Sequence, residues 1–135
     1  CNTLPLSADH RAFRELRDAI AVLLERGEKI LIYPEQGMWW NYRKPRPLQE
    51  GAFDLALLSN VPVVPIFITM EDTDTIDGDG FPVQAFTVHI LPAIYPDPEK
   101  TLRENTEEMK NKNFALWKEV YERTYGVALS YGEQE

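Results

Sequence analysis

The spacing of apolar residues along the chain predicts three helices. Apolar positions recur every three to four residues over 7–26, where Ser7 is a suitable N-cap and Gly27 a suitable end. A short helix is expected over 50–59 and a long one over 101–125. The inward-facing positions should be Phe13, Leu16, Ile20, Leu23 and Leu24, then Phe53, Ala56 and Leu57, then Leu102, Met109, Phe114, Trp117, Val120 and Tyr121.

Three further segments are typical of strands. Residues 29–33 form a short apolar run, and 83–91 alternate between two faces. Residues 61–70 are almost entirely apolar, as expected of a strand covered on both faces. Pro62 and Pro65 have no backbone N–H to donate to a neighbouring strand. Their presence predicts an irregular strand beside a groove. The alternative is that Pro62 only starts the strand and Pro65 only marks a bulge.

The order of these elements predicts an α/β fold. A helix between the first two strands implies a right-handed βαβ unit. We expect one domain over 1–135, with a small mixed or mostly parallel sheet flanked by the helices. The acidic segment 71–80 should be a loop between strands. It does not have the residues of an EF-hand, so no metal site is expected there.

Composition and charge exclude several classes of function. The formal net charge of −8 argues against non-specific nucleic-acid binding. The single cysteine, Cys1, excludes an internal disulfide and a cysteine-based zinc site. No apolar run approaches the roughly 20 residues that cross a bilayer. Because the chain lacks an initiator methionine and starts in loop-like sequence, we expect it to be a piece of a longer polypeptide.

The candidate chemistry lies in the loop after the first expected strand. Glu35 follows Pro34, and three cations, Arg43, Lys44 and Arg46, stand among prolines and aromatics. A carboxylate accepts hydrogen bonds from hydroxyl groups, and guanidinium and ammonium groups bind phosphate. These residue types suit a phosphorylated polyol. The alternative is a solvated loop in which Glu35 forms an ion pair with Arg43 or Lys44.

The same loop holds three aromatic residues that admit two interpretations. Trp39, Trp40 and Tyr42 suit contact with a membrane interface or an acyl-chain entrance. They equally suit a packing role, in which they cover the sheet edge and hold the long loop in place. Stacking on nucleic-acid bases is disfavoured by the acidic net charge.

The ordered motifs resemble the C-terminal part of the glycerolipid acyltransferases of the lysophosphatidic acid acyltransferase type. Tyr33-Pro34-Glu35 is similar to the Phe-Pro-Glu block of that family, and 51–56 to the helix start that follows. Residues 61–66, Val-Pro-Val-Val-Pro-Ile, are nearly identical to the family's last block. The resemblance spans about 7–70. It implies a substrate site made by Glu35, Gly37, Arg43, Lys44 and Arg46, with Pro34, Gln36, Pro62 and Pro65 lining a groove.

The chain departs from the family pattern in two ways. Gln36 stands where the family usually has glycine, and the usual Thr-Arg pair is absent, so Arg43 is the best counterpart of the phosphate-binding arginine. The family's His-x-x-x-x-Asp motif, whose His is the general base, is also missing. The sequence from His10 to Glu15 has that spacing but ends in Glu and lies too close to Glu35. His89 is interpreted as a structural histidine. We therefore expect no catalytic residue in this chain.

The resemblance implies a fragment of an O-acyltransferase that is inactive by itself. The parent would move a fatty acyl group from acyl-CoA or acyl carrier protein to 1-acyl-glycerol-3-phosphate or a similar acceptor, with no bound cofactor. It would work at the cytoplasmic face of a membrane, and its missing N-terminal part would be a partner of this segment. Two alternatives stay open: a non-catalytic lipid- or phosphate-binding module, and an unrelated α/β enzyme acting on a phosphorylated small molecule.

Overall fold

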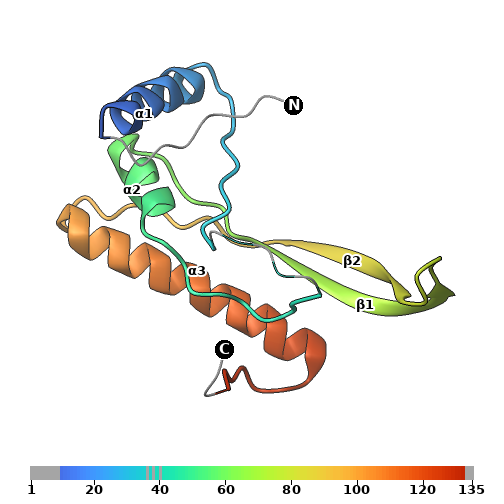
Figure 1. The fold of residues 1–135 in the computed structure, drawn as a ribbon. Coiled ribbons are helices and arrows are strands. Elements are labelled where there is room, and N and C mark those ends of the chain that lie inside the picture. Colours follow the sequence, from blue (N-terminus) through green and yellow to red (C-terminus); the bar gives the residue numbers. More distant parts are fainter. Residues whose placement is uncertain (1–9, 36, 38, 40, 133–135) are drawn as a thin grey trace.

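The chain folds into three helices and one small sheet. The computed structural model describes residues 10–35, 37, 39 and 41–132. The elements are α1 (His10–Glu25), α2 (Gly51–Leu58), β1 (Ile66–Ile76), β2 (Pro82–Ile90) and α3 (Leu102–Tyr125), as Figure 1 shows. The predicted α/β class, with a small sheet flanked by helices, is confirmed. Ser7, the expected N-cap of the first helix, lies outside the described residues.

The sheet is an antiparallel hairpin. Register runs from Ile66 opposite Ile90 to Ile76 opposite Pro82, with an irregularity after Asp72. Most of the acidic segment 71–80, predicted as a loop, is therefore strand. Thr73, Thr75 and Ile76 explain the difference, because β-branched residues favour extended backbone even between carboxylates.

The expected strand over 29–33 is absent, and with it the βαβ unit. The segment has no regular structure, and the side chains of Leu31 and Tyr33 are 66% and 77% exposed. Its expected parallel neighbour, 61–65, holds two prolines that cannot donate to a ladder. Val63 pairs instead with Ile94, through hydrogen bonds of 2.9 Å and 2.8 Å. A five-residue segment without a hydrogen-bonded neighbour does not stay extended as a strand.

The hairpin packs on α3 through its inner face. Phe67 is buried, and its ring centroid lies 5.5 Å from that of Trp117. The hydroxyl of Tyr125 accepts a hydrogen bond from the Met70 N–H (3.0 Å) and donates one to the Met70 carbonyl (3.1 Å). Tyr125 thereby occupies backbone groups on the outer edge of β1 and fixes the hairpin to the last turn of α3. Figure 1 shows the hairpin and α3, the two elements that this contact joins.

Both ends of α3 are set by local chemistry. Thr101 and Glu104 form a capping box at its start, and Gly126, with φ of 67°, ends it in the left-handed conformation. The expected burial of Met109, Trp117, Val120 and Tyr121 is confirmed. Leu102 was expected inside but is 52% exposed, because it lies in the first turn, before the helix reaches the hairpin.

Polar residues of α3 supply contacts that the apolar pattern did not reveal. Thr106 is buried and donates from its hydroxyl to Oδ1 of Asp54 on α2, at 2.6 Å. Buried Asn105 accepts the Asp97 N–H at 2.8 Å. These bonds hold the start of α3 against α2 and against the connector that precedes it.

Two apolar clusters meet at α2. One joins α3, the hairpin and Phe53 of α2, while the other joins Leu16 and Ile20 of α1 to Leu55 of α2. Because α2 contributes to both clusters, it sets the position of α1 relative to the rest of the molecule. It also fixes the C-terminal end of the loop that carries the candidate chemistry.

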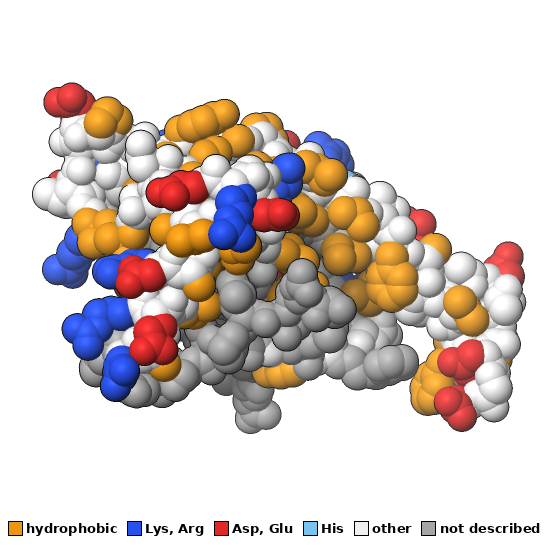
Figure 2. Space-filling view, turned by 90° about the horizontal axis from the view of Figure 1, so that it is seen from above, with side chains coloured by type: hydrophobic (Ala, Val, Ile, Leu, Met, Phe, Trp, Pro, Cys, Tyr) orange, Lys and Arg blue, Asp and Glu red, His pale blue; other side chains and the backbone are white. Residues whose placement is uncertain are grey.

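The outer face of the hairpin is apolar and exposed. Residues 61–70 were predicted to form a strand covered on both faces. The prediction is wrong for 66–70, which begin β1 and alternate between a buried and a more exposed face. Figure 2 shows hydrophobic side chains toward the hairpin and acidic side chains at its far end. The exposed apolar residues of this outer face are Ile66, Ile68, Phe86, Val88 and Ile90. Antiparallel pairing explains the exposure, because alternate residues face away from α3.

Candidate functional site

The candidate site is the loop of residues 34–49, called the cation loop below. It leaves and returns at one point, because the Gln49 N–H donates to the Pro34 carbonyl at 2.9 Å. Pro45 and Leu48 are buried and anchor the returning half. The loop therefore has a fixed base and a buried anchor, although its described residues form no helix or strand.

Glu35 and Arg46 lie together in this loop. The Arg46 N–H donates to Oε2 of Glu35 at 3.2 Å, and Nη1 of Arg46 donates to the Gly37 carbonyl at 2.8 Å. The Arg46 guanidinium also lies over the Trp39 ring, 4.1 Å from its centroid. Burial raises the pKa of the Glu35 carboxyl, although the Arg46 N–H and charge act in the opposite direction.

Gly37 leaves room for this arrangement. A Cβ atom at Gly37 would lie 2.8 Å from Nη1 of Arg46, which is closer than real Cβ contacts allow. The glycine therefore lets the guanidinium approach the backbone. At Gly51, the first residue of α2, a Cβ atom would meet no described atom within 4 Å, so this glycine is not needed for a close approach.

Arg43 is directed away from Arg46, toward the hairpin. Its Nη2 donates to Oδ1 of Asp72 at 2.6 Å and to Oε1 of Gln84 at 3.3 Å. The guanidinium also lies 5.9 Å from the centroid of the Tyr125 ring. The alternative in which Glu35 pairs with Arg43 is wrong, because Asp72 is the carboxylate that Arg43 contacts. Nothing in the sequence pattern pointed to Asp72 and Gln84 as neighbours of the loop.

Lys44 is directed toward the C-terminal segment. Its Nζ lies 6.0 Å from the centroid of the Tyr131 ring. The Tyr131 hydroxyl in turn donates to the carbonyl of Pro45, the residue between Lys44 and Arg46. Tyr131 was not among the predicted site residues, because the segment after Gly126 has no apolar period that would place it.

The remaining residues of the predicted groove occupy different environments. Pro34 is half-buried at the base of the loop, Pro62 is exposed, and Pro65 is fully buried directly before β1. The Pro65 carbonyl accepts the Leu91 N–H at 3.0 Å. Gln36 lies outside the described residues.

The aromatic residues of the loop pack against one another. The rings of Trp39 and Tyr42 meet edge to face, with centroids 5.0 Å apart, while the Trp39 side chain is 48% exposed. The Tyr42 N–H donates to the Trp39 carbonyl at 3.3 Å, which closes a turn around Asn41. Trp40 lies outside the described residues. Packing of the loop is thus an observed role of Trp39 and Tyr42.

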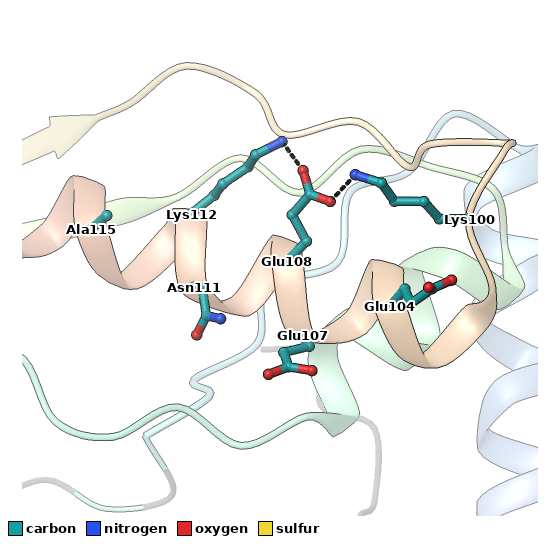
Figure 3. Close-up of a pocket in the computed structure, with 7 residues that line it drawn as sticks. All are labelled: Lys100, Glu104, Glu107, Glu108, Asn111, Lys112 and Ala115. Atoms are coloured by element: carbon teal, nitrogen blue, oxygen red, sulfur yellow. Dashed lines mark hydrogen bonds and ion pairs between the residues drawn. The ribbon is translucent and has the colours of Figure 1, made fainter.

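A shallow hollow lies elsewhere, on the solvent side of α3. Figure 3 shows Glu108 between Lys100 and Lys112, with a distance of 2.5 Å between Glu108 and Lys112. The two cations lower the pKa of the Glu108 carboxyl to about 2. The full lining consists of Lys100, Glu104, Glu107, Glu108, Asn111, Lys112 and Ala115. None of these is a predicted site residue, and the internal ion pairing of the hollow leaves it no net attraction for an anion.

His89 lies on β2 and contacts a residue of β1. Nε2 of His89 lies 2.8 Å from Oγ1 of buried Thr69, which supports its interpretation as a structural histidine. Glu15 accepts a hydrogen bond from Nε of Arg11 at 3.2 Å, and the side chain of His10 lies outside the described part. No group of three His, Cys, Asp or Glu residues gathers as a metal site among the described residues.

Comparison with known proteins found a similarity in the segment that holds the cation loop. Residues 4–69 match a family model described as Acyltransferase. This segment, slightly less than half of the chain, is similar to the acyltransferase family. It ends at Thr69, inside β1, so the cation loop, α2 and the groove prolines Pro34, Pro62 and Pro65 lie within it, whereas β2 and α3 lie beyond it. Curated proteins and solved structures gave no match.

Among the described residues, none of the helices combines the length and the apolar composition that a bilayer crossing requires.

Proposed function

We propose that this chain is part of an O-acyltransferase that makes phospholipids. The reaction would move a fatty acyl group from acyl-CoA or acyl carrier protein to the hydroxyl of 1-acyl-glycerol-3-phosphate or a similar acceptor. The hydroxyl oxygen would attack the thioester carbonyl, the thiolate would leave, and a base would take the hydroxyl proton. The observation that carries the proposal is the Acyltransferase match over the segment that contains Glu35 and Arg46.

The cation loop would bind the acceptor's phosphate group. Arg46 donates through Nη1 to Gly37, and its guanidinium has further N–H donors that a phosphate would accept. Lys44, two residues away, would add a positive charge beside it. Arg43 would join them by breaking its contact with Asp72 and binding the phosphate instead. Glu35 would accept hydrogen bonds from the acceptor's hydroxyls or continue to hold the Arg46 N–H.

Pro34, Gln36, Pro62 and Pro65 would line the path of the acceptor or of the acyl chain. Two of them flank the Val63–Ile94 bridge, where the chain enters β1. The carbonyls of Val63 and Pro65 already accept the Ile94 and Leu91 N–H groups, so the backbone at this point is held in place.

The base would come from outside this chain. We propose that the parent polypeptide supplies a His-x-x-x-x-Asp motif upstream of Cys1 and acts at the cytoplasmic face of a membrane. The isolated chain would then bind the acceptor without turning it over. A non-catalytic binding module is the second candidate, and it is favoured by the ion-paired state of Arg43, which restrains the loop.

Calorimetric titration with sn-glycerol 3-phosphate tests the binding step. Saturable binding is expected, and Arg46→Gln should weaken it by about tenfold, since a charge-assisted hydrogen bond contributes about 1.5–3 kcal/mol. Arg14→Gln, on the exposed side of α1, is the matched control and should bind as the wild type does. Equal binding by Arg46→Gln would refute the phosphate role of the loop.

An acyl-transfer assay tests the catalytic assignment. The purified chain, given an acyl-CoA and lysophosphatidate, should release no coenzyme A above the uncatalysed rate. Turnover would show that the chain contains its own base. The natural coding sequence upstream of Cys1 separates the two candidates: a His-x-x-x-x-Asp motif there supports the enzyme, and its absence supports the binding module.

A further inference from the structure

We infer that Tyr131, on the C-terminal segment beyond the family match, is a positioning residue for the phosphate-binding cations of the loop. The inference rests on the proposed function for its ligand. It assigns a role to residues 126–132, which follow α3 and lie outside the matched segment 4–69.

The C-terminal segment turns back along α3 before it reaches the loop. Gly126, with φ of 67°, reverses the chain at the end of the helix. The Leu129 N–H then donates to Oε1 of Glu122 at 2.8 Å, and the partly buried Leu129 side chain packs against the main apolar cluster. These two contacts bring Tyr131 to the cation loop by a defined path.

Tyr131 holds the backbone of the loop at the position between its two neighbouring cations. Its hydroxyl donates to the Pro45 carbonyl, and Pro45 is among the most deeply buried side chains of the molecule. The next residue, Arg46, is held through its N–H by Glu35. Two successive residues are thus fixed by two different hydrogen bonds, one from the C-terminal segment and one from within the loop.

The ring of Tyr131 also lies beside the preceding cation, Lys44, whose Nζ is 6.0 Å from the ring centroid. Burial, with contributions from Tyr42 and from the Glu35 carboxylate, raises the pKa of the Tyr131 hydroxyl. The hydroxyl therefore keeps its proton, and its ability to donate, at neutral pH. One side chain contacts both Lys44 and Pro45, so it sets the direction in which Lys44 and Arg46 leave the backbone.

Tyr131→Phe tests this role, because it keeps the ring beside Lys44 and removes only the hydroxyl. The first readout is hydrogen exchange of the Arg46 amide, which should become about twofold to tenfold faster as the loop loosens. The second is calorimetric titration with sn-glycerol 3-phosphate, in which the dissociation constant should rise by about threefold to tenfold. Tyr95→Phe, at a 69% exposed tyrosine before α3, is the matched control and should change neither readout.

The outcomes separate this inference from the proposed function. Unchanged exchange at Arg46 in Tyr131→Phe would overturn the inference. It would also be overturned if exchange became faster and Arg46→Gln weakened binding, while Tyr131→Phe bound as the wild type does. A wild-type chain that does not bind sn-glycerol 3-phosphate would refute the proposed function, and the inference would lose its ligand with it. Faster exchange together with weaker binding supports both.

Discussion

Nη2 of Arg43 lies 2.6 Å from Oδ1 of Asp72, and this contact ties the cation loop to β1. The same Asp72 oxygen accepts a hydrogen bond from Gln84 on β2 at 2.6 Å, so one carboxylate joins three segments of the chain. The hydrogen bond from Gln84 is the main cause that lowers the pKa of the Asp72 carboxyl, and the charge and hydrogen bond of Arg43 lower it further. The contact is partly exposed, which limits its strength because solvent screens the charges.

A double-mutant cycle with Arg43→Gln and Asp72→Asn measures this connection. Each single change should lower the free energy of unfolding by up to about 1 kcal/mol, and the double change by less than the sum of both. Urea denaturation provides the measurement. The matched control is the Arg17–Asp18 pair, which joins adjacent residues of α1 and should show no coupling to Arg43. Strict additivity of Arg43→Gln and Asp72→Asn would contradict the finding.

Asp72→Asn should also change ligand binding. With Asp72 neutral, Arg43 is released for phosphate, and we expect sn-glycerol 3-phosphate to bind about twofold to threefold more tightly at low salt. Calorimetric titration at two ionic strengths measures the effect, which should shrink as salt is added. Asp97→Asn, in the connector before α3, is a control of equal charge change. Weaker binding by Asp72→Asn would mean that Arg43 must stay on the hairpin for the loop to function.

The elements that the sequence predicted well are those that local chemistry determines. Helix α3 begins at a Thr101–Glu104 capping box and ends at left-handed Gly126, and both signals lie within a few residues of the ends that they set. Strand β2 was predicted from its alternating faces, and its register with β1 preserves that alternation. Neither prediction needed a distant residue.

The strand expected over 29–33 failed because a strand depends on its neighbour. Its apolar residues suit a sheet, but Pro62 and Pro65 interrupt the segment that would have paired with it. The candidate site shows the same limit. Glu35 and Arg46 were named correctly as residues of one loop, whereas the Asp72 and Tyr131 contacts join residues 29 and 86 positions apart. No spacing rule connects residues at such separations.

The pH dependence of stability tests the environment of Glu35. Burial raises the pKa of this carboxyl above its ordinary value in the folded chain, so the folded state binds a proton more readily than the unfolded state does. The contribution of Glu35 to stability is therefore largest below the unfolded pKa and is lost as pH rises through the folded pKa. The free energy of unfolding of the wild type, relative to Glu35→Gln, should fall as pH rises from about 4 to 7.

Urea denaturation of both proteins at several pH values gives this difference directly. Comparison with Glu35→Gln removes the contribution of the other carboxylates, because they are common to both chains. The prediction would be contradicted if the free energy of unfolding of the wild type, relative to Glu35→Gln, rose with pH. Such a rise would mean that the Arg46 N–H and charge outweigh burial at Glu35.

Glu108 tests a pH dependence of stability with the opposite sign to that of Glu35. Hydrogen bonds from Lys100 and Lys112 lower the pKa of its carboxyl to about 2. Its contribution to stability is therefore present above the unfolded pKa and is lost as pH falls from about 4.5 toward 2. Carboxyl-carbon NMR should give a titration midpoint near 2, and Lys100→Gln should raise it. Lys118→Gln, whose cation lies 3.8 Å from Glu122, is the control and should leave the Glu108 midpoint unchanged.

Phe67 and Phe86, one on each strand of the hairpin, test which of its faces stabilises the fold. Phe67 is 7% exposed and packs on Trp117, whereas Phe86 is 64% exposed on the face directed away from α3. Phe67→Ala should lower the free energy of unfolding by about 3–5 kcal/mol, since it leaves a cavity in the core. Phe86→Ala should change it by less than about 0.5 kcal/mol.

The same pair also tests whether the outer face is accessible in solution. An exposed apolar surface binds hydrophobic dyes and promotes association between molecules. Phe86→Ser should therefore lower the fluorescence of a bound apolar dye and reduce light scattering at high protein concentration, with the midpoint of urea unfolding unchanged. If Phe86→Ala destabilised the chain as much as Phe67→Ala does, the outer face of the hairpin would have to be packed against other residues rather than exposed to solvent.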